Sequence, residues 1–229
     1  MLEMLKAAGP LFWVLIALSI YVVYLFILRF QMLHKASGDP TLMLTRVNAA
    51  LMQQDLVGAQ QEARRARTPA ANVLRAGLER AGTGTDAAIA AMQDAQLVED
   101  SRLFSGLNTL GTLAQIAPLL GLLGTVIGMI RSFIVFANTA APTPSQLAAG
   151  ISEALVNTGG GLVVAILAYV FRSILRAKAD GIALHADRVR ESLPAWLLEA
   201  NLRHQGQLSG APIGLYDPRA SLEPQEVTA

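Results

Sequence analysis

Thr125 and Thr158 are the side chains best suited to proton chemistry, because each places a hydroxyl inside a long uncharged segment. Counted from Arg131 and Glu153 at about 1.5 Å per helical residue, Thr125 lies about 9 Å and Thr158 about 7.5 Å inside. Two hydroxyls at one depth predict a narrow polar path that holds water. The alternative is that each hydroxyl bonds its own helix at the carbonyl four residues back, as membrane Ser and Thr commonly do.

Arg131 and Glu153 are the only charged residues in the stretch 103–171. A lone charge at mid-membrane costs at least about 2.5 to 3.5 kcal/mol, so such residues either have a function or lie at the interface. Two interpretations stay open: the pair marks the headgroup level or joins two helices, or Glu153 takes part in proton uptake. Asn157 is polar and needs a partner, and the default interpretation is a hydrogen bond between helices.

The rest of the sequence lacks the groups that other chemistries need. No Asp, His or Lys lies in the uncharged segments, so another subunit must supply a carboxylate if protons pass. The 3 histidines have no metal-ligand spacing, and the chain contains 0 cysteines. There is no Walker loop, nucleophile elbow or dinucleotide fingerprint. We therefore expect no enzyme activity, no metal and no cofactor, and the net charge of +1 excludes a nucleic-acid partner.

The composition requires contact with lipid, because 53% of the 229 residues are hydrophobic and only 15% are charged. Three uncharged segments are long enough to cross a bilayer core of about 30 Å. The predicted spans are residues 9–28, 103–131 and 153–171. A cleaved signal peptide is the alternative for the first segment, but the segment is long and no convincing small-x-small cleavage site follows it.

Lys and Arg set the orientation, because they are frequent after each of positions 28 and 171 and absent from 132–152. This bias predicts an outside N-terminus and a cytoplasmic C-terminus. Besides the spans, the predicted divisions are an outside leader (1–8), a cytoplasmic helical connector (29–102), an outside turn with the start of the third helix (132–152), a cytoplasmic helical extension (172–205) and a flexible tail (206–229).

Local signals divide the predicted helices. Helix starts are expected at Asp39-Pro40, Thr68-Pro69 and Thr143-Pro144, and a break is expected at Gly82-Thr83-Gly84. From Asp86 onward no stop signal precedes the second span, and a similar continuation follows Arg172 to Pro194. The sequence therefore predicts an all-α membrane protein with three transmembrane helices, of which the second and third extend into a cytoplasmic helical bundle.

Small residues predict close helix packing in both later spans. On a helical wheel, one face of the second span collects Ala114, Ala117, Gly121, Gly124, Thr125, Gly128 and Ser132. Gly124 and Gly128 form a GxxxG pair, and Pro118 is expected to bend the helix. The glycines at 159–161 weaken a helix by about 1 kcal/mol each, which predicts a close partner backbone. The packing residues are Gly121, Gly124, Gly128, Gly160, Gly161 and Pro118.

The segment from Ala117 to Met129, followed by Gly150-Ile151-Ser152-Glu153-Ala154-Leu155, Thr158 and Gly161-Leu162, resembles the MotA/TolQ/ExbB proton-channel family, in particular its ExbB and TolQ branch. The three-span order extends the resemblance to about 200 residues, whereas the four-span flagellar branch fits worse. The sequence departs from the family pattern at Asn157, at 159–161 and at Leu167, where a proline often follows Ala-Ile.

The resemblance implies a stator subunit of the bacterial inner membrane, with a periplasmic N-terminus, that couples proton flow to motion. It implies a homopentamer whose second and third helices line a pore around a dimeric ExbD- or TolR-like partner, which supplies a membrane aspartate. Thr125, Thr158 and Asn157 would line the pore and Glu153 would lie at its outer end. A TonB- or TolA-like energy transducer is a further expected partner. A non-conducting scaffold and, less favoured, a secondary transporter are the alternatives.

Overall fold

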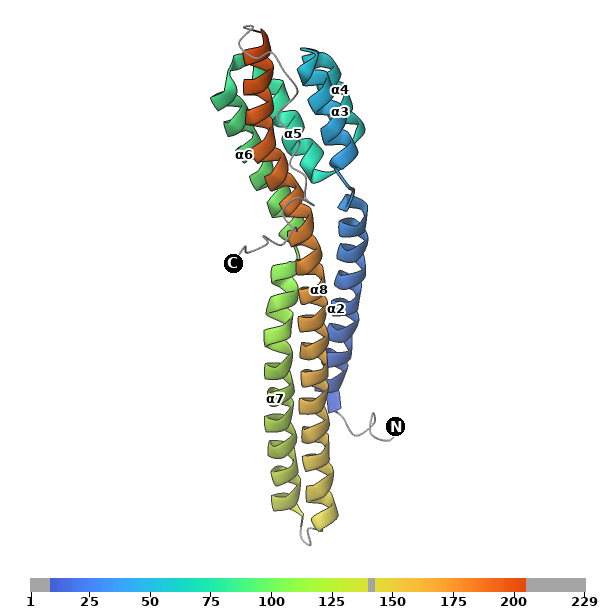
Figure 1. Cartoon of the computed structure of the whole chain (residues 1–229). Helices are drawn as coiled ribbons and strands as arrows, with labels where there is room; N and C mark the ends of the chain where they lie inside the picture. Colours follow the sequence, from blue (N-terminus) through green and yellow to red (C-terminus); the bar gives the residue numbers. More distant parts are fainter. Residues whose placement is uncertain (1–8, 140–142, 205–229) are drawn as a thin grey trace, which may run out of the picture.

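The computed structural model describes residues 9–139 and 143–204, so the predicted leader, the whole predicted tail and part of the outside turn lie outside the described residues. Within that part of the chain every regular element is helical (Figure 1). The helices are α2 (Gly9–Ala36), α3 (Thr41–Met52), α4 (Leu56–Arg65), α5 (Pro69–Arg80), the 3₁₀ turn η1 (Ala81–Thr83), α6 (Thr85–Phe104), α7 (Leu107–Asn138) and α8 (Pro144–His204).

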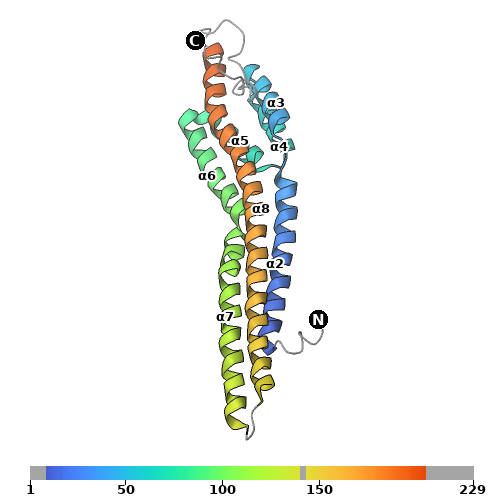
Figure 2. The same ribbon diagram turned by 60° about the horizontal axis from the view of Figure 1, so that its bottom comes forward.

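Three of these helices are long and apolar enough to cross a membrane, which confirms the predicted all-α membrane fold. The helices α7 and α8 run antiparallel along the lower part of the molecule, with α2 beside them (Figures 1 and 2). The upper part is a bundle in which α3 to α6 pack around the C-terminal half of α8. As predicted, α8 continues from its apolar half into this bundle without interruption, and it runs past Pro194.

Helix α7 is not continuous with α6, and the prediction of one uninterrupted helix from Asp86 is wrong at this point. The chain breaks at Ser105 and Gly106, and Gly106 has a φ of 80°, in the left-handed region that glycine adopts without strain. The Nη2 of Arg29, on α2, donates a hydrogen bond to Ser105 Oγ at 2.9 Å. The break is thus stabilised by a residue 76 positions away, which local sequence patterns do not reveal.

The predicted helix starts are confirmed. Thr68 Oγ1 accepts a hydrogen bond from the Ala71 backbone N–H at 3.3 Å, and Pro69 occupies the first helical position of α5. Helix α8 begins at Pro144, and α3 begins directly after Pro40. The predicted break is η1 followed by Gly84, which has a φ of 125°. Pro118 lies within α7, which remains helical from Leu107 to Asn138.

The upper bundle has an apolar core made by α3, α4, α5, α6 and α8. Its fully buried members include Val47, Val73, Leu74, Leu78, Met92, Val189 and Leu193. A second buried cluster joins α2, α7 and α8 in the lower part, and it includes Val22, Leu110, Ala117, Ala168 and Leu175. The long helix α8 therefore connects the lower, apolar part of the molecule to the upper bundle through both cores.

A carboxyl group lies between α6 and α8 just above the α6–α7 break. Burial raises the pKa of Asp100, the carboxylates of Asp187 and Glu99 raise it further, and Arg190 opposes them. A raised pKa in the folded state means that folding favours the protonated form. The resulting stabilisation is full below the unfolded pKa of about 3.9 and is lost as pH rises through the folded pKa.

We therefore predict that Asp100→Asn stabilises the protein at neutral pH, because the amide keeps the shape of the carboxyl group without its charge. The melting temperature at pH 7.5 is expected to rise by up to about 3 °C, with no rise at pH 4. Circular dichroism of the detergent-solubilised chain measures this, with Asp94→Asn on the exposed side of α6 as the control. Equal shifts at both pH values would contradict the prediction.

Candidate functional site

Thr158 connects the two long helices of the membrane part. Its Oγ1, on α8, donates a hydrogen bond to the backbone carbonyl of Gly121 on α7 at 3.3 Å. The alternative in which this hydroxyl bonds its own helix is therefore wrong for Thr158. The contact depends on the small size of Gly121, because a Cβ there would lie 3.0 Å from the carbonyl oxygen of Asn157 and 3.2 Å from the Cα of Thr158.

Thr125 behaves differently from Thr158. Its Oγ1 donates a hydrogen bond to the carbonyl of Leu122 in its own helix at 2.6 Å. Thr125 therefore bonds its own helix, as the alternative expected, although the acceptor carbonyl is three residues back and not four. The side chain is half-buried, so its oxygen lies beside an open face of α7 in the single chain.

Asn157 lies between the helices and not on an open face. Its side chain is 2% exposed and packs against Gly124, where an added Cβ would lie 2.5 Å from the Asn157 Cβ. Its Oδ1 is buried and has no hydrogen-bond partner among the described residues. In the single chain Asn157 thus differs from the expected pore-lining position, because the missing side chain of Gly124 makes room for it between the helices of the hairpin, which consists of α7 and residues 144–171 of α8.

Arg131 and Glu153 connect the other end of the hairpin. Arg131 Nη1 lies 3.3 Å from Glu153 Oε1, and the Glu153 side chain is 15% exposed whereas that of Arg131 is 52% exposed. The pair joins α7 to α8, as one of the two interpretations expected. An exposed ion pair contributes about 0 to 1 kcal/mol, so it is a weak clamp.

The glycines of α8 have unequal surroundings. A Cβ at Gly161 would lie 2.6 Å from the carbonyl oxygen of Ala117 and 2.9 Å from the Cα of Gly121. At Gly160 it would lie 3.5 Å from Leu15 on α2, and at Gly159 it would meet nothing within 4 Å. The backbones of α7 and α8 therefore touch at Gly161, whereas Gly159 points away from the hairpin.

A close contact beyond the expected site lies towards the loop end of the hairpin. Ser132 is 6% exposed, and a Cβ at Gly150 would lie 1.5 Å from its Oγ. Gly128 lies on the same face, where its added Cβ would be 3.2 Å from the Cβ of Ala154. Sequence analysis placed Ser132 on the small-residue face but missed Gly150. The need for a glycine at position 150 can be recognised only once the pairing of α7 with α8 is known.

The same hairpin identifies the protein's relatives. Residues 65–188 match the MotA/TolQ/ExbB proton channel family, a range that includes α7, the loop region and most of α8. The chain belongs to this family. Its ExbB-named relatives favour the ExbB/TolQ-like branch, as the resemblance predicted.

Three curated relatives illustrate the match. A putative biopolymer transport protein ExbB homolog of Methanothermobacter thermautotrophicus is 29% identical over 180 residues, which cover 78% of this chain and 64% of the relative. The biopolymer transport protein exbB1 of Vibrio cholerae is 38% identical over 125 residues, 54% of this chain and 50% of the relative. The putative ExbB-like 3 protein of Synechocystis is 46% identical over 78 residues, 33% of this chain and 37% of the relative.

The matched part of each relative is shorter than two thirds of that relative's length. The comparisons therefore establish only the family of this chain. This ExbB-like chain is a multi-pass membrane protein of a proton-channel family, which is a transport family and not a known enzyme family. The polar groups that this family member places in its hairpin are those described above.

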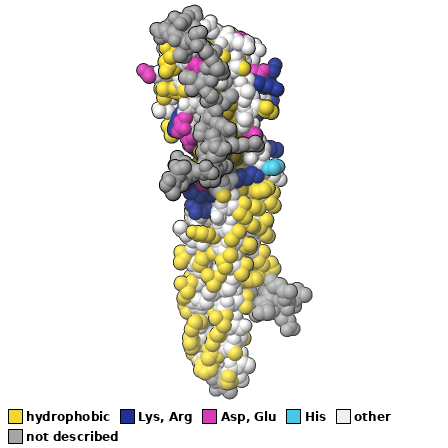
Figure 3. Space-filling view, viewed as in Figure 1, with side chains coloured by type: hydrophobic (Ala, Val, Ile, Leu, Met, Phe, Trp, Pro, Cys, Tyr) yellow, Lys and Arg dark blue, Asp and Glu magenta, His cyan; other side chains and the backbone are white. Residues whose placement is uncertain are grey.

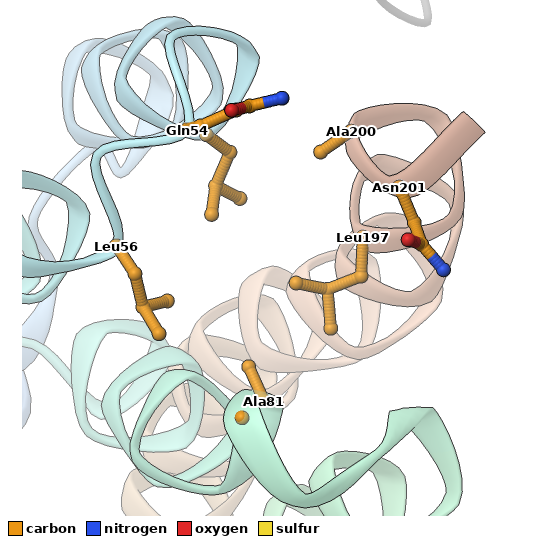
Figure 4. A pocket seen from close by; sticks show the side chains of 8 residues that line it. Gln54, Leu56, Ala81, Leu197, Ala200 and Asn201 are labelled. Atoms are coloured by element: carbon orange, nitrogen blue, oxygen red, sulfur yellow. The ribbon is translucent and has the colours of Figure 1, made fainter. Parts of the chain in front are cut away.

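A cavity among the described residues of this ExbB-like chain lies far from those groups. It has a volume of about 600 Å³ at the end of the upper bundle (Figure 4), and it is lined by Leu51, Gln54, Leu56, Ala81, Gly82, Leu197, Ala200 and Asn201. None of these side chains titrates, so the lining provides no acid or base. The cavity is therefore not a candidate for proton transfer.

Proposed function

We propose that the chain is the channel-forming stator subunit of a motor in the bacterial inner membrane that is driven by the proton-motive force. The observation that carries the proposal is the Thr158 to Gly121 hydrogen bond, which holds a hydroxyl at the contact between α7 and the apolar half of α8 in a proton-channel family member. The hairpin contains no carboxylate apart from Glu153 at its outer end. A proton-binding group must therefore come from a partner.

The proposed assembly is a homopentamer in which α7 and α8 surround the membrane helices of a dimeric ExbD- or TolR-like partner. Thr125 and Thr158 line the pore, Glu153 lies at its outer end, and Asn157 holds the two helices of one subunit together. A membrane aspartate of the partner binds and releases each proton. Motion of the partner is passed on to a TonB- or TolA-like energy transducer.

The proposed placement in the bilayer follows the predicted spans 9–28, 103–131 and 153–171, with the N-terminus in the periplasm. The contact of Arg29 with Ser105 supports a common inner boundary, because it brings the ends of the first and second segments to one level. Each proton that crosses releases about 2.3 kcal/mol per 100 mV, which is available for conformational work without any chemical bond being broken.

Proton flux in liposomes tests the proposal. The chain is reconstituted with its ExbD- or TolR-like partner, and acidification of the lumen is followed with a pH-sensitive dye under an imposed potential. We expect flux with the wild-type partner and none with a partner whose membrane aspartate is changed to asparagine. Absence of flux from a correctly assembled wild-type complex would support the non-conducting scaffold instead.

A further inference from the structure

A small pocket lies between α2 and the C-terminal end of α6. Its volume is about 110 Å³, and its lining consists of Arg29, Met32, Leu33, Ala36, Pro69, Glu99, Arg102 and Leu103. One water molecule occupies about 30 Å³ of liquid, so the pocket admits a phosphate-sized group but not a whole lipid. Five of the eight lining residues are apolar and three are charged, as expected of a site that receives an amphipathic molecule.

The pocket lies where the apolar part of the molecule ends. Arg29 is near the end of the first uncharged segment, and its bond to Ser105 holds it beside the α6–α7 break. The guanidinium of Arg176 lies 5.9 Å from the centre of the Phe104 ring at the same break. Figure 3 shows Lys and Arg side chains gathered where the largely hydrophobic lower part of the molecule gives way to the charged upper part.

The charges around the pocket leave one cation without a counter-ion. Arg102 lies 3.0 Å from Glu99, and Glu99 also accepts a hydrogen bond from Asn72 at 3.1 Å, so this buried carboxylate is already engaged. Arg29 has only neutral partners among the described residues, Ser105 Oγ and Met32 Sδ. Its positive charge is therefore available to an anion.

The α7 N-terminus adds to the attraction for an anion. Helix α7 has no side-chain cap, and its first backbone N–H groups follow Gly106. The Nε of Arg29 lies 2.5 Å from the position that a Cβ on Gly106 would take, so the guanidinium lies directly over this helix start. The partial positive charge of a helix N-terminus favours phosphate, and here it acts in the same place as the guanidinium.

We propose that this pocket binds the phosphate of an anionic phospholipid from the cytoplasmic leaflet. Arg29 holds the phosphate, Arg102 contributes at the rim, and Leu33 and Leu103 contact the glycerol end of the acyl chains. A lipid is favoured over a soluble phosphate because the pocket combines an unpaired cation with aliphatic walls at the membrane boundary. The inference rests on the proposed placement in the bilayer and not on proton conduction.

Lipid retention measured by native mass spectrometry tests the site. The purified full chain is mixed with equal amounts of phosphatidylglycerol and phosphatidylcholine, and the bound lipid is counted after release from detergent. We expect preferential retention of phosphatidylglycerol and a loss of about five- to tenfold with Arg29→Gln. Lys35→Gln is the matched control, because Lys35 is also a positively charged residue of α2 but does not line the pocket.

Further measurements distinguish lipid binding at this pocket from non-specific attraction by positive charge and from binding of free phosphate. Arg102→Gln is a second variant whose side chain is 69% exposed, and thermal unfolding shows that each variant is folded. Millimolar inorganic phosphate is expected to leave lipid retention unchanged. The proposal is overturned by equal retention of both lipids, by a loss with Lys35→Gln as large as with Arg29→Gln, or by displacement of the lipid by inorganic phosphate. Unchanged proton flux in the variants would leave the proposed function intact, since the two experiments have separate readouts.

Discussion

Thr158→Val is expected to reduce proton flux by about 100-fold or more while the subunit still folds and assembles. Valine has nearly the same shape as threonine, so the variant removes the hydroxyl and leaves the packing of α8 in place. The lost bond to the Gly121 carbonyl has an expected value of about 0.6 kcal/mol, since hydrogen bonds between membrane helices average that amount. A stability change that small does not separate α7 from α8.

Flux in liposomes that contain both subunits measures the effect, and size-exclusion chromatography in detergent reports assembly. Thr158→Ser is the matched control, because it keeps the hydroxyl and is expected to keep most of the flux. Thr125→Val is expected to abolish flux as well, although Thr125 bonds its own helix and loses no contact with α8. Unimpaired flux in both valine variants would show that neither hydroxyl lies on the proton path.

Gly161→Ala is expected to destabilise the hairpin, and Gly159→Ala is expected to stabilise it or leave it unchanged. The Cβ at Gly161 would lie 2.6 Å from the Ala117 carbonyl oxygen, and backbone atoms of α7 cannot rotate away as a flexible side chain does. Overpacking of this kind costs about 1 to 3 kcal/mol, which exceeds the gain of about 1 kcal/mol from replacing a helical glycine. At Gly159 alanine brings the same gain in helix stability, and its Cβ would meet no atom within 4 Å.

Thermal unfolding in detergent, followed by circular dichroism, separates the two variants. The melting temperature is expected to fall by about 4 °C with Gly161→Ala and to stay level or rise with Gly159→Ala. Both glycines lie on α8 and both substitutions add one methyl group, so helix propensity cancels in the comparison. A fall of equal size in both would mean that the close contact of α7 and α8 is absent or that Gly159 also lies at an interface.

Much of the fold follows from the sequence alone because it depends on near neighbours in the chain. Uncharged segments as long as a bilayer is thick have few alternatives to helix, since every backbone polar group must be satisfied inside the lipid. The start of α5 also depends on neighbouring residues only, because it is set by the hydroxyl of Thr68 and the fixed φ of Pro69. The family resemblance is also readable at this level, because its motif lies within α7 and the first half of α8.

Other features depend on how distant segments meet. The break at Gly106 interrupts a pattern that looks helical throughout, and it is stabilised by Arg29 from another helix. The acceptor of Thr158 lies 37 residues away, at a position set by the register in which the small residues of α7 and α8 interlock. The same register buries Asn157 against Gly124 and separates the roles of Gly159 and Gly161. Hydropathy and capping are properties of a segment, whereas register is a property of two packed surfaces, so only the tertiary structure decides which polar group meets which backbone.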